Sequence, residues 1–298
     1  MDTTKLEDII VDLYRKTTTE LPEDVFNAIK TSKATENGLA KNILDSIIKN
    51  SEISKEKSIP ICQDTGIPTF YIEHGKGVDE ETIKKIILKA TTRATKKVPL
   101  RPNAVNSITG TNLNENIGIF FPVIYFKQKN MNGLKISLLL KGGGSENMGY
   151  RYALPDSKLN AGRTLEGVRR CILDAIHRAQ GKGCSPGIIS VCIGGSKDVI
   201  AFLAKKQLCE KLLRKNKNSE LNLLEKRIIK EANSLGIGPM GLGGNSTVLD
   251  VKICETHRHP ASYFVEVAYS CWALRRYTIN ISNEGKVSYG HVEIADSY

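Results

Sequence analysis

The stretch Pro60-Ile-Cys-Gln-Asp-Thr-Gly-Ile-Pro68 places a thiol, an amide, a carboxylate and a hydroxyl at four consecutive positions, from Cys62 to Thr65. The glycine and the two prolines restrict its backbone to a turn. Residues 69–73, which follow, are rich in β-branched and aromatic side chains and favour a strand. A loop with several reactive groups is therefore expected to lead directly into a sheet. The alternative is a buried turn whose cysteine acts as a small apolar residue, the commonest role of a lone cysteine.

The composition is that of a globular protein. The chain has 298 residues, of which 40% are hydrophobic and 25% charged, enough for one large domain or two ordinary ones. No apolar run is long enough to cross a bilayer, and the start of the chain lacks a signal-peptide pattern. We therefore expect a cytoplasmic protein with no membrane partner.

The charge balance favours anionic partners. Lysine and arginine number 43 and aspartate and glutamate 32, which favours nucleic acid, acidic metabolites or an acidic subunit. The most basic segment, 205–230, also carries glutamates, and its leucines recur at helical spacing. It has no interleaved aromatic residues on which bases would stack, so nucleic acid is not expected as a partner.

The periodicity of apolar residues predicts a mixed α/β fold. Residues 1–55 have apolar faces at helical spacing and form a helical N-terminal part. Further helices are expected at 79–97 and 164–180, and strands at 117–126, 134–140, 188–193, 247–254 and 263–270. We expect one large domain over residues 1–298, with mixed sheets flanked by helices.

Two loops carry groups that suit an acidic ligand. Arg101 stands between Pro99 and Pro102, which limit its freedom, and a presented guanidinium suits a carboxylate. Lys141-Gly-Gly-Gly-Ser145 follows a predicted strand, and its glycines allow backbone N–H groups to approach an anion closely. The run matches neither a P-loop nor a dinucleotide fingerprint. An ordinary surface arginine and an ordinary glycine turn remain the simpler interpretations.

The seven cysteines show no CxxC pair and no zinc-finger spacing, and disulfides are not expected in a cytosolic chain. Cys62, Cys184 and Cys271 lie in loops or at strand ends, beside glycine or polar residues. They are either buried residues or the ligands of a metal site assembled from distant parts of the chain. Three thiolates suffice to hold three irons of a cubane cluster and leave the fourth iron open to substrate. Asp64, His259 and Arg101 are then available for proton transfer and for binding an acid.

A series of motifs in fixed order resembles the class I iron-sulfur fumarases and tartrate dehydratases, and the resemblance covers most of the chain after its first fifth. The motifs are Cys62-Gln-Asp-Thr-Gly66, Lys141-Gly-Gly-Gly-Ser145, Cys184 before a strand that ends in Ile193-Gly-Gly195, Gly241-Leu-Gly-Gly244, Arg258-His259 with Ala261-Ser262, and Ser270-Cys271.

The resemblance implies a site. It implies a four-iron four-sulfur cluster held by Cys62, Cys184 and Cys271. It also implies that Gln63 and Asp64 contact a small dicarboxylate substrate and that Asp64 pairs with His259 as acid and orienting group. The substrate-binding residues implied in addition are Arg101, Gly143 and Gly144.

The resemblance also implies partners. Single-chain members of the family continue into a C-terminal domain with further cations and the opposing catalytic base, whereas this sequence stops at Tyr298. We therefore expect the alpha subunit of a two-subunit enzyme that needs a separate beta subunit and forms homodimers through the alpha chain.

The expected reaction is the reversible hydration of fumarate to malate. Dehydration of L(+)-tartrate is the alternative, because it needs the same groups with room for one more hydroxyl. A basic nucleic-acid-binding or zinc-structured protein is the alternative from another class, and it rests only on the charge balance and the cysteines.

Overall fold

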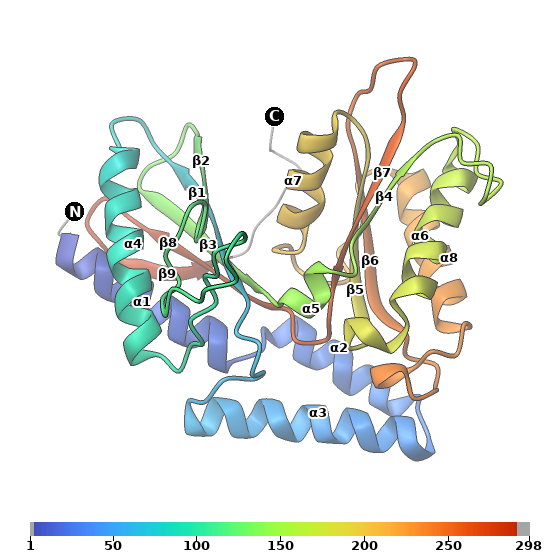
Figure 1. Cartoon of the computed structure of the whole chain (residues 1–298), viewed down its shortest axis with the longest axis horizontal. Coiled ribbons are helices and arrows are strands. Elements are labelled where there is room, and N and C mark those ends of the chain that lie inside the picture. Colours follow the sequence, from blue (N-terminus) through green and yellow to red (C-terminus); the bar gives the residue numbers. More distant parts are fainter. Residues whose placement is uncertain (1–2, 291–298) are drawn as a thin grey trace. The chain divides into compact units, whose positions relative to one another are not determined.

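The computed structural model describes residues 3–290 (Figure 1). The described chain divides into two compact units. The first comprises residues 3–22, 49–143 and 275–290, and the second comprises residues 23–48 and 144–274. Each unit has its own sheet and its own apolar core. The predicted class, a mixed α/β fold with mixed sheets, flanking helices and a helical N-terminal part, is confirmed, while the single domain boundary at 1–298 stays a prediction.

The first unit is built on a five-stranded sheet in the order β2-β1-β3-β8-β9. Its strands are β1 (Ile67–His74), β2 (Val123–Gln128), β3 (Leu134–Lys141), β8 (Arg275–Ile281) and β9 (Val287–Gly290). β1 runs parallel to β2, and the other neighbouring strands pair antiparallel. Helices α1 (Thr3–Thr19) and α4 (Glu80–Lys97) share one apolar core with this sheet. Because β1 pairs with β3 so that Ile67 is opposite Lys141, the turn before β1 lies beside the glycine run after β3.

The second unit is built on a four-stranded sheet in the order β4-β7-β5-β6. Its strands are β4 (Tyr150–Ala153), β5 (Gly187–Gly194), β6 (Val248–Glu255) and β7 (Phe264–Ser270). Helices α6 (Leu165–Ala179) and α8 (Ser219–Asn233) share the core with one face, and α7 (Lys197–Gln207) packs on β5 and β7 from the other (Figure 1). β5 and β7 are neighbouring antiparallel strands, with Ile188 opposite Ser270. The chain therefore enters β5 beside the point where it leaves β7.

The remaining helices are α2 (Glu23–Ala34), α3 (Gly38–Lys57) and the short α5 (Gly143–Glu146). The predicted helix ends are confirmed by their caps. The side chain of Asp79 accepts from Glu81 N–H before α4, and Thr164 accepts from Gly167 N–H before α6. No helix in residues 3–290 combines the length and the apolar character that a membrane span needs.

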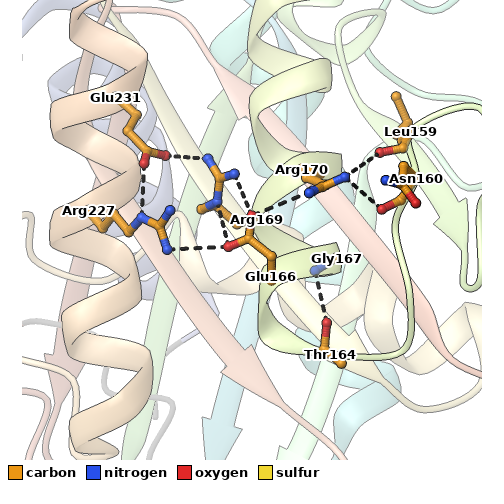
Figure 2. A network of polar contacts seen from close by, with 9 residues as sticks. All are labelled: Leu159, Asn160, Thr164, Glu166, Gly167, Arg169, Arg170, Arg227 and Glu231. Carbon is orange, nitrogen blue, oxygen red and sulfur yellow. Dashed lines mark hydrogen bonds and ion pairs between the residues drawn. The ribbon is translucent and has the colours of Figure 1, made fainter.

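An ion-pair network joins α6 to α8 (Figure 2). Arg169 Nη1 lies 2.6 Å from Glu231 Oε2, and Arg227 Nη1 lies 3.3 Å from Glu166 Oε2. The hydrogen bond from Arg169 lowers the pKa of Glu166 to about 2. Because folding lowers this pKa, the ion pairs of Glu166 stabilise the folded state at neutral pH. This stabilisation is lost as the pH falls from the ordinary carboxyl range towards 2. The exposed position of Glu166 keeps its contribution small.

One predicted element is wrong. The strand expected at 117–126 begins only at Val123, because the residues before it form a turn in which Gly118 N–H donates to Phe121 O over 2.7 Å. Phe120 in this turn has a φ of +53°, outside the extended region. The turn leaves Ile119 and Phe120 exposed.

Candidate active site

The turn before β1 holds the Asp64 carboxylate against the glycine run after β3. Asp64 Oδ1 accepts from Gly66 N–H over 3.0 Å. A Cβ atom at Gly142 would lie 2.8 Å from Asp64 Oδ2, closer than two such atoms can approach. Gly66 needs its glycine as well, since its φ is +84° and a Cβ there would lie 2.9 Å from backbone carbons of β3. These contacts fix the carboxylate at the end of the sheet.

The loop that carries Arg101 is fastened to the same turn. The buried hydroxyl of Thr65 accepts from Arg101 N–H over 3.0 Å and from Asn103 Nδ2 over 3.2 Å. Asn103 Nδ2 also donates to Gly66 O over 3.1 Å. The buried side chain of Asn116 donates to Arg101 O and accepts from Asn103 N–H, both over 3.0 Å. The Arg101 backbone is therefore fixed beside the Asp64 turn, while its side chain is exposed.

Gly143 and Gly144 are the predicted backbone donors to substrate. A Cβ at Gly143 would lie 3.9 Å from Asp64 Oδ2, so Gly143 is a neighbour of the carboxylate. A Cβ at Gly144 would meet nothing within 4 Å. Gln63 is exposed at the tip of the turn, and Cys62 is half-buried beside it. The first unit therefore brings Asp64, Gly143 and the Arg101 loop together.

The second unit brings two of the predicted thiols together. Cys184 follows the short 3-10 helix η1 (Gln180–Gly183) in the left-handed region, with a φ of +52°. The N–H of Trp272 donates to Cys184 O over 3.3 Å, which ties the residue after Cys271 to this turn. Both cysteines are half-buried, and none of the seven cysteines, all of which lie in residues 3–290, forms a disulfide bond.

Tyr269 packs beneath the Cys184 turn. A Cβ at Gly183 would lie 2.4 Å from Tyr269 Cε1, and a Cβ at Gly187 would lie 2.6 Å from Tyr269 Oη. Burial, the main cause, and the neighbouring thiols of Cys271 and Cys184 raise the pKa of the phenol. The Cys184 turn therefore rests directly on the ring of Tyr269, at two positions where only glycine fits.

A glycine-rich loop supports the same turn from another direction. Ser185 Oγ donates to Gly238 O over 2.6 Å, and Met240 N–H donates to Ser185 O over 2.8 Å. A Cβ at Gly241 would lie 2.5 Å from Gly181 Cα. This close approach explains the glycine at position 241 of the Gly241-Leu-Gly-Gly244 motif.

Gly183→Ala is expected to destabilise the second unit and to displace the Cys184 turn. The Tyr269 ring is 2% exposed and has little room to move, so overpacking is expected to cost about 1–3 kcal/mol of unfolding free energy. Chemical denaturation followed by circular dichroism measures this cost. Gly162→Ala is the matched control, because a Cβ there meets nothing within 4 Å. Equal stability of the two variants would contradict the packing described for Tyr269.

His259 lies in an exposed loop between β6 and β7. Its Nδ1 accepts from Ala261 N–H over 3.1 Å, so the neutral ring carries its proton on Nε2. Arg258 Nη1 donates to three carbonyls of this loop, those of His259, Pro260 and Ser262. Arg258 therefore holds the backbone of the loop that carries His259. Asp64 belongs to the first unit and His259 to the second, and their pairing stays a prediction.

Two of the other four cysteines are poor candidates for metal ligands. Burial raises the pKa of Cys171 to about 12. The pKa of Cys254 is raised most by its hydrogen bond with Cys192, which is itself fully buried. Metal ligands must be thiolates, and the raised pKa values of Cys171 and Cys254 favour the protonated thiol at these two positions. Cys209 follows α7 and is 6% exposed.

Sequence reasoning missed the residues that hold the site in place. Asn103, Asn116 and Tyr269 contact partners far away in the chain, so no local pattern identifies them. Thr65 stands in the opening motif, but its hydrogen bonds to the Arg101 loop were not predicted. In the part of the chain that the structure describes, no three His, Cys, Asp or Glu side chains gather at metal-binding distance. Cys62 belongs to the first unit, Cys184 and Cys271 to the second, and the assignment of all three as ligands stays a prediction.

In the first unit, a carboxylate fixed among glycines beside a presented arginine suits an acidic substrate. Comparison with known proteins agrees. The profile of the family described as fumarate hydratase (Fumerase) matches residues 7–280. The chain belongs to this family of hydro-lyases, and the resemblance found in the motifs is confirmed.

Three relatives show how the chain compares in length. It is 45% identical over 289 residues to a putative class I fumarate hydratase of Geobacillus stearothermophilus, covering 95% of this chain and 56% of that protein. It is 39% identical over 289 residues to a putative L(+)-tartrate dehydratase subunit alpha of Methanocaldococcus jannaschii, covering 95% of this chain and 100% of that protein. It is 31% identical over 278 residues to the L(+)-tartrate dehydratase subunit alpha of Escherichia coli K12, covering 92% and 90%. The chain thus spans just over half of the first relative and the whole length of the second.

Proposed function

We propose that this chain is the alpha subunit of an iron-sulfur hydro-lyase that interconverts fumarate and malate together with a separate beta subunit. The observation that carries the proposal is the 45% identity with a relative named as a class I fumarate hydratase, together with the Asp64 turn held beside the Arg101 loop. The relatives named as alpha subunits support a partner chain. We further propose that the alpha chains form a homodimer.

The proposed cofactor is a four-iron four-sulfur cluster held by Cys62, Cys184 and Cys271. The three thiols suit this cofactor. Trp272 N–H, next to Cys271 at the end of β7, donates to Cys184 O, and all three cysteines are half-buried on turns or at a strand end. Thiolate sulfur is the donor that iron-sulfur clusters require. A bound cluster with an open iron would supply Lewis acidity towards a carboxylate and hydroxyl of the substrate.

The residues of this chain then have separate tasks in hydration. Water adds across the carbon-carbon double bond, one carbon receiving a proton and the other a hydroxyl group. Asp64 moves one proton, with His259 as its orienting partner, and a group on the beta subunit moves the other. Arg101 binds a substrate carboxylate, because its backbone is fixed and its guanidinium is exposed. Gln63 and the N–H groups of Gly143 and Gly144 complete substrate binding.

Dehydration of L(+)-tartrate is the second candidate, because two of the relatives carry that name. Its substrate differs from malate by one hydroxyl, and the same carboxylate, arginine and thiols serve it. Steady-state rates on malate and on each stereoisomer of tartrate separate the two reactions. A higher kcat/KM for L(+)-tartrate would replace the fumarate assignment.

The proposal is tested by assaying the anaerobically reconstituted chain on fumarate with and without the beta subunit. We expect turnover only in the complex, because the opposing proton-transfer group is on the partner. Full activity of this chain alone would refute the two-subunit arrangement. A reconstituted complex that is inactive on both fumarate and tartrate would refute the hydro-lyase.

A further inference from the structure

The segment from Pro102 to Pro122 presents large apolar side chains to solvent at two tips. Ile108, at the first tip, is 96% exposed. Ile119 and Phe120, at the second, are 95% and 87% exposed. Val105 and Leu113 at the base of the first tip are about half exposed, 50% and 46%. Several large apolar side chains exposed on one short segment are typical of an interaction surface.

Both tips are held by hydrogen bonds. Asn106 Oδ1 accepts from Ile108 N–H over 2.9 Å and from Thr109 N–H over 3.0 Å. Gly118 and Phe121 exchange two backbone hydrogen bonds, of 2.7 and 3.1 Å. Leu113 joins the tips, since a Cβ at Gly118 would lie 3.7 Å from Leu113 Cδ1. Hydrogen bonds within each tip therefore fix the backbone that carries the exposed apolar residues.

The second tip holds Phe120 in a backbone conformation that bulky residues avoid, with a φ of +53°. The Phe120 ring is almost fully exposed, so packing within residues 3–290 does not offset the free-energy cost of this backbone conformation. The segment between the two prolines has a single charged residue, Glu115, in a chain whose net charge is +11. A surface with a single charge and large exposed apolar side chains matches a protein-protein interface better than a site for an anion.

The tips share their framework with the candidate site. Asn116, between the tips, is 2% exposed and holds both Arg101 O and Asn103 N–H. Asn103 in turn binds Thr65 and Gly66 of the Asp64 turn. A chain that covers the tips therefore lies next to the groups that bind and protonate substrate.

The lengths of the relatives indicate which chain that is. This chain accounts for 56% of the Geobacillus stearothermophilus relative and for all of the Methanocaldococcus jannaschii alpha subunit. Under the proposed function, the remaining part of the longer relative corresponds to the separate beta subunit. The inference rests on that proposed function. We propose that Ile108, Ile119 and Phe120 form the docking surface for that beta subunit, which thereby completes the site at Arg101.

The test measures binding of the beta subunit to the full chain by biolayer interferometry. The variant Ile119→Ser with Phe120→Gly is expected to weaken the Kd at least about tenfold, because it removes the apolar side chains that bury on docking. Phe120→Gly keeps the turn, since glycine adopts its φ without strain. Leu223→Ser on α8, 67% exposed in the second unit, is the matched control and is expected to leave the Kd unchanged.

Thermal unfolding of each variant shows whether it is folded, and the Phe120→Gly single variant is expected to melt at or above the temperature of the parent. Binding of the double variant that equals that of the Leu223→Ser control would overturn the proposal. So would sedimentation showing that the parent chain alone is a dimer and the double variant a monomer, because the surface would then take a second copy. A complex that forms through these residues and lacks hydro-lyase activity would refute the proposed function while supporting the docking surface.

Discussion

Anaerobic reconstitution with iron and sulfide is expected to fail when any one of Cys62, Cys184 and Cys271 is replaced by alanine. Each variant removes one of the three proposed sulfur ligands, and the half-buried positions of these residues make the substitution mild for the fold. The expected result is loss of the brown absorbance and of nearly all bound iron and sulfide. Turnover with the beta subunit is expected to disappear with them.

The chain offers its own matched controls in the four remaining cysteines. Alanine at these positions shortens the side chain by one atom and removes no proposed ligand, so iron and sulfide binding is expected to stay at the parental level. The control positions are Cys171, Cys192, Cys209 and Cys254. Loss of the cluster at one of these and retention at Cys184 or Cys271 would show that the ligands have been assigned wrongly.

The second large effect is expected for Asp64→Asn. The amide keeps the shape of the side chain and its contact with Gly66 N–H, yet it cannot accept a proton at neutral pH. We expect kcat on fumarate to fall by about 10²–10⁴, the usual contribution of a general acid or base, with iron and sulfide content unchanged. Steady-state kinetics of the complex with the beta subunit give the first quantity, and metal analysis gives the second.

Gly142→Ala separates the position of this carboxylate from its chemistry. The new Cβ would lie 2.8 Å from Asp64 Oδ2 and must push the carboxylate away, although every ionisable group is retained. A loss of kcat comparable to that of Asp64→Asn is expected, whereas the control Gly162→Ala, with nothing within 4 Å of its Cβ, is expected to leave kcat unchanged. Near-parental kcat in Asp64→Asn would remove this residue from the proton transfer.

The elements that the sequence predicts well are those specified by neighbouring residues. The helix at 80–97 begins after Asp79, whose side chain caps it, and Lys96 and Lys97 lie in its last turn as the helix dipole favours. The strand expected at 117–126 is wrong because Ile119 and Phe120, which favour a strand by composition, lie in the turn that Gly118 closes on Phe121. Composition alone does not show this turn.

The candidate site divides in the same way. Cys62, Asp64 and Cys184 stand in motifs of consecutive residues, so the sequence identifies them. Their supports act over long sequence separations: Asn116 holds the Arg101 loop, and Tyr269 fills the space at Gly183. A glycine in the sequence does not show which side chain excludes its Cβ. The packing around the thiols therefore required the structure.

The central claim is that Cys62, Cys184 and Cys271 hold one cluster with an iron left open to substrate. Mössbauer spectroscopy of the anaerobically reconstituted chain with its beta subunit tests it most directly, recorded with and without malate. The account predicts a four-iron four-sulfur spectrum in which malate shifts the signal of one iron and leaves the other three unchanged. Zinc without sulfide in the purified protein, or a spectrum in which malate changes no iron, would contradict it.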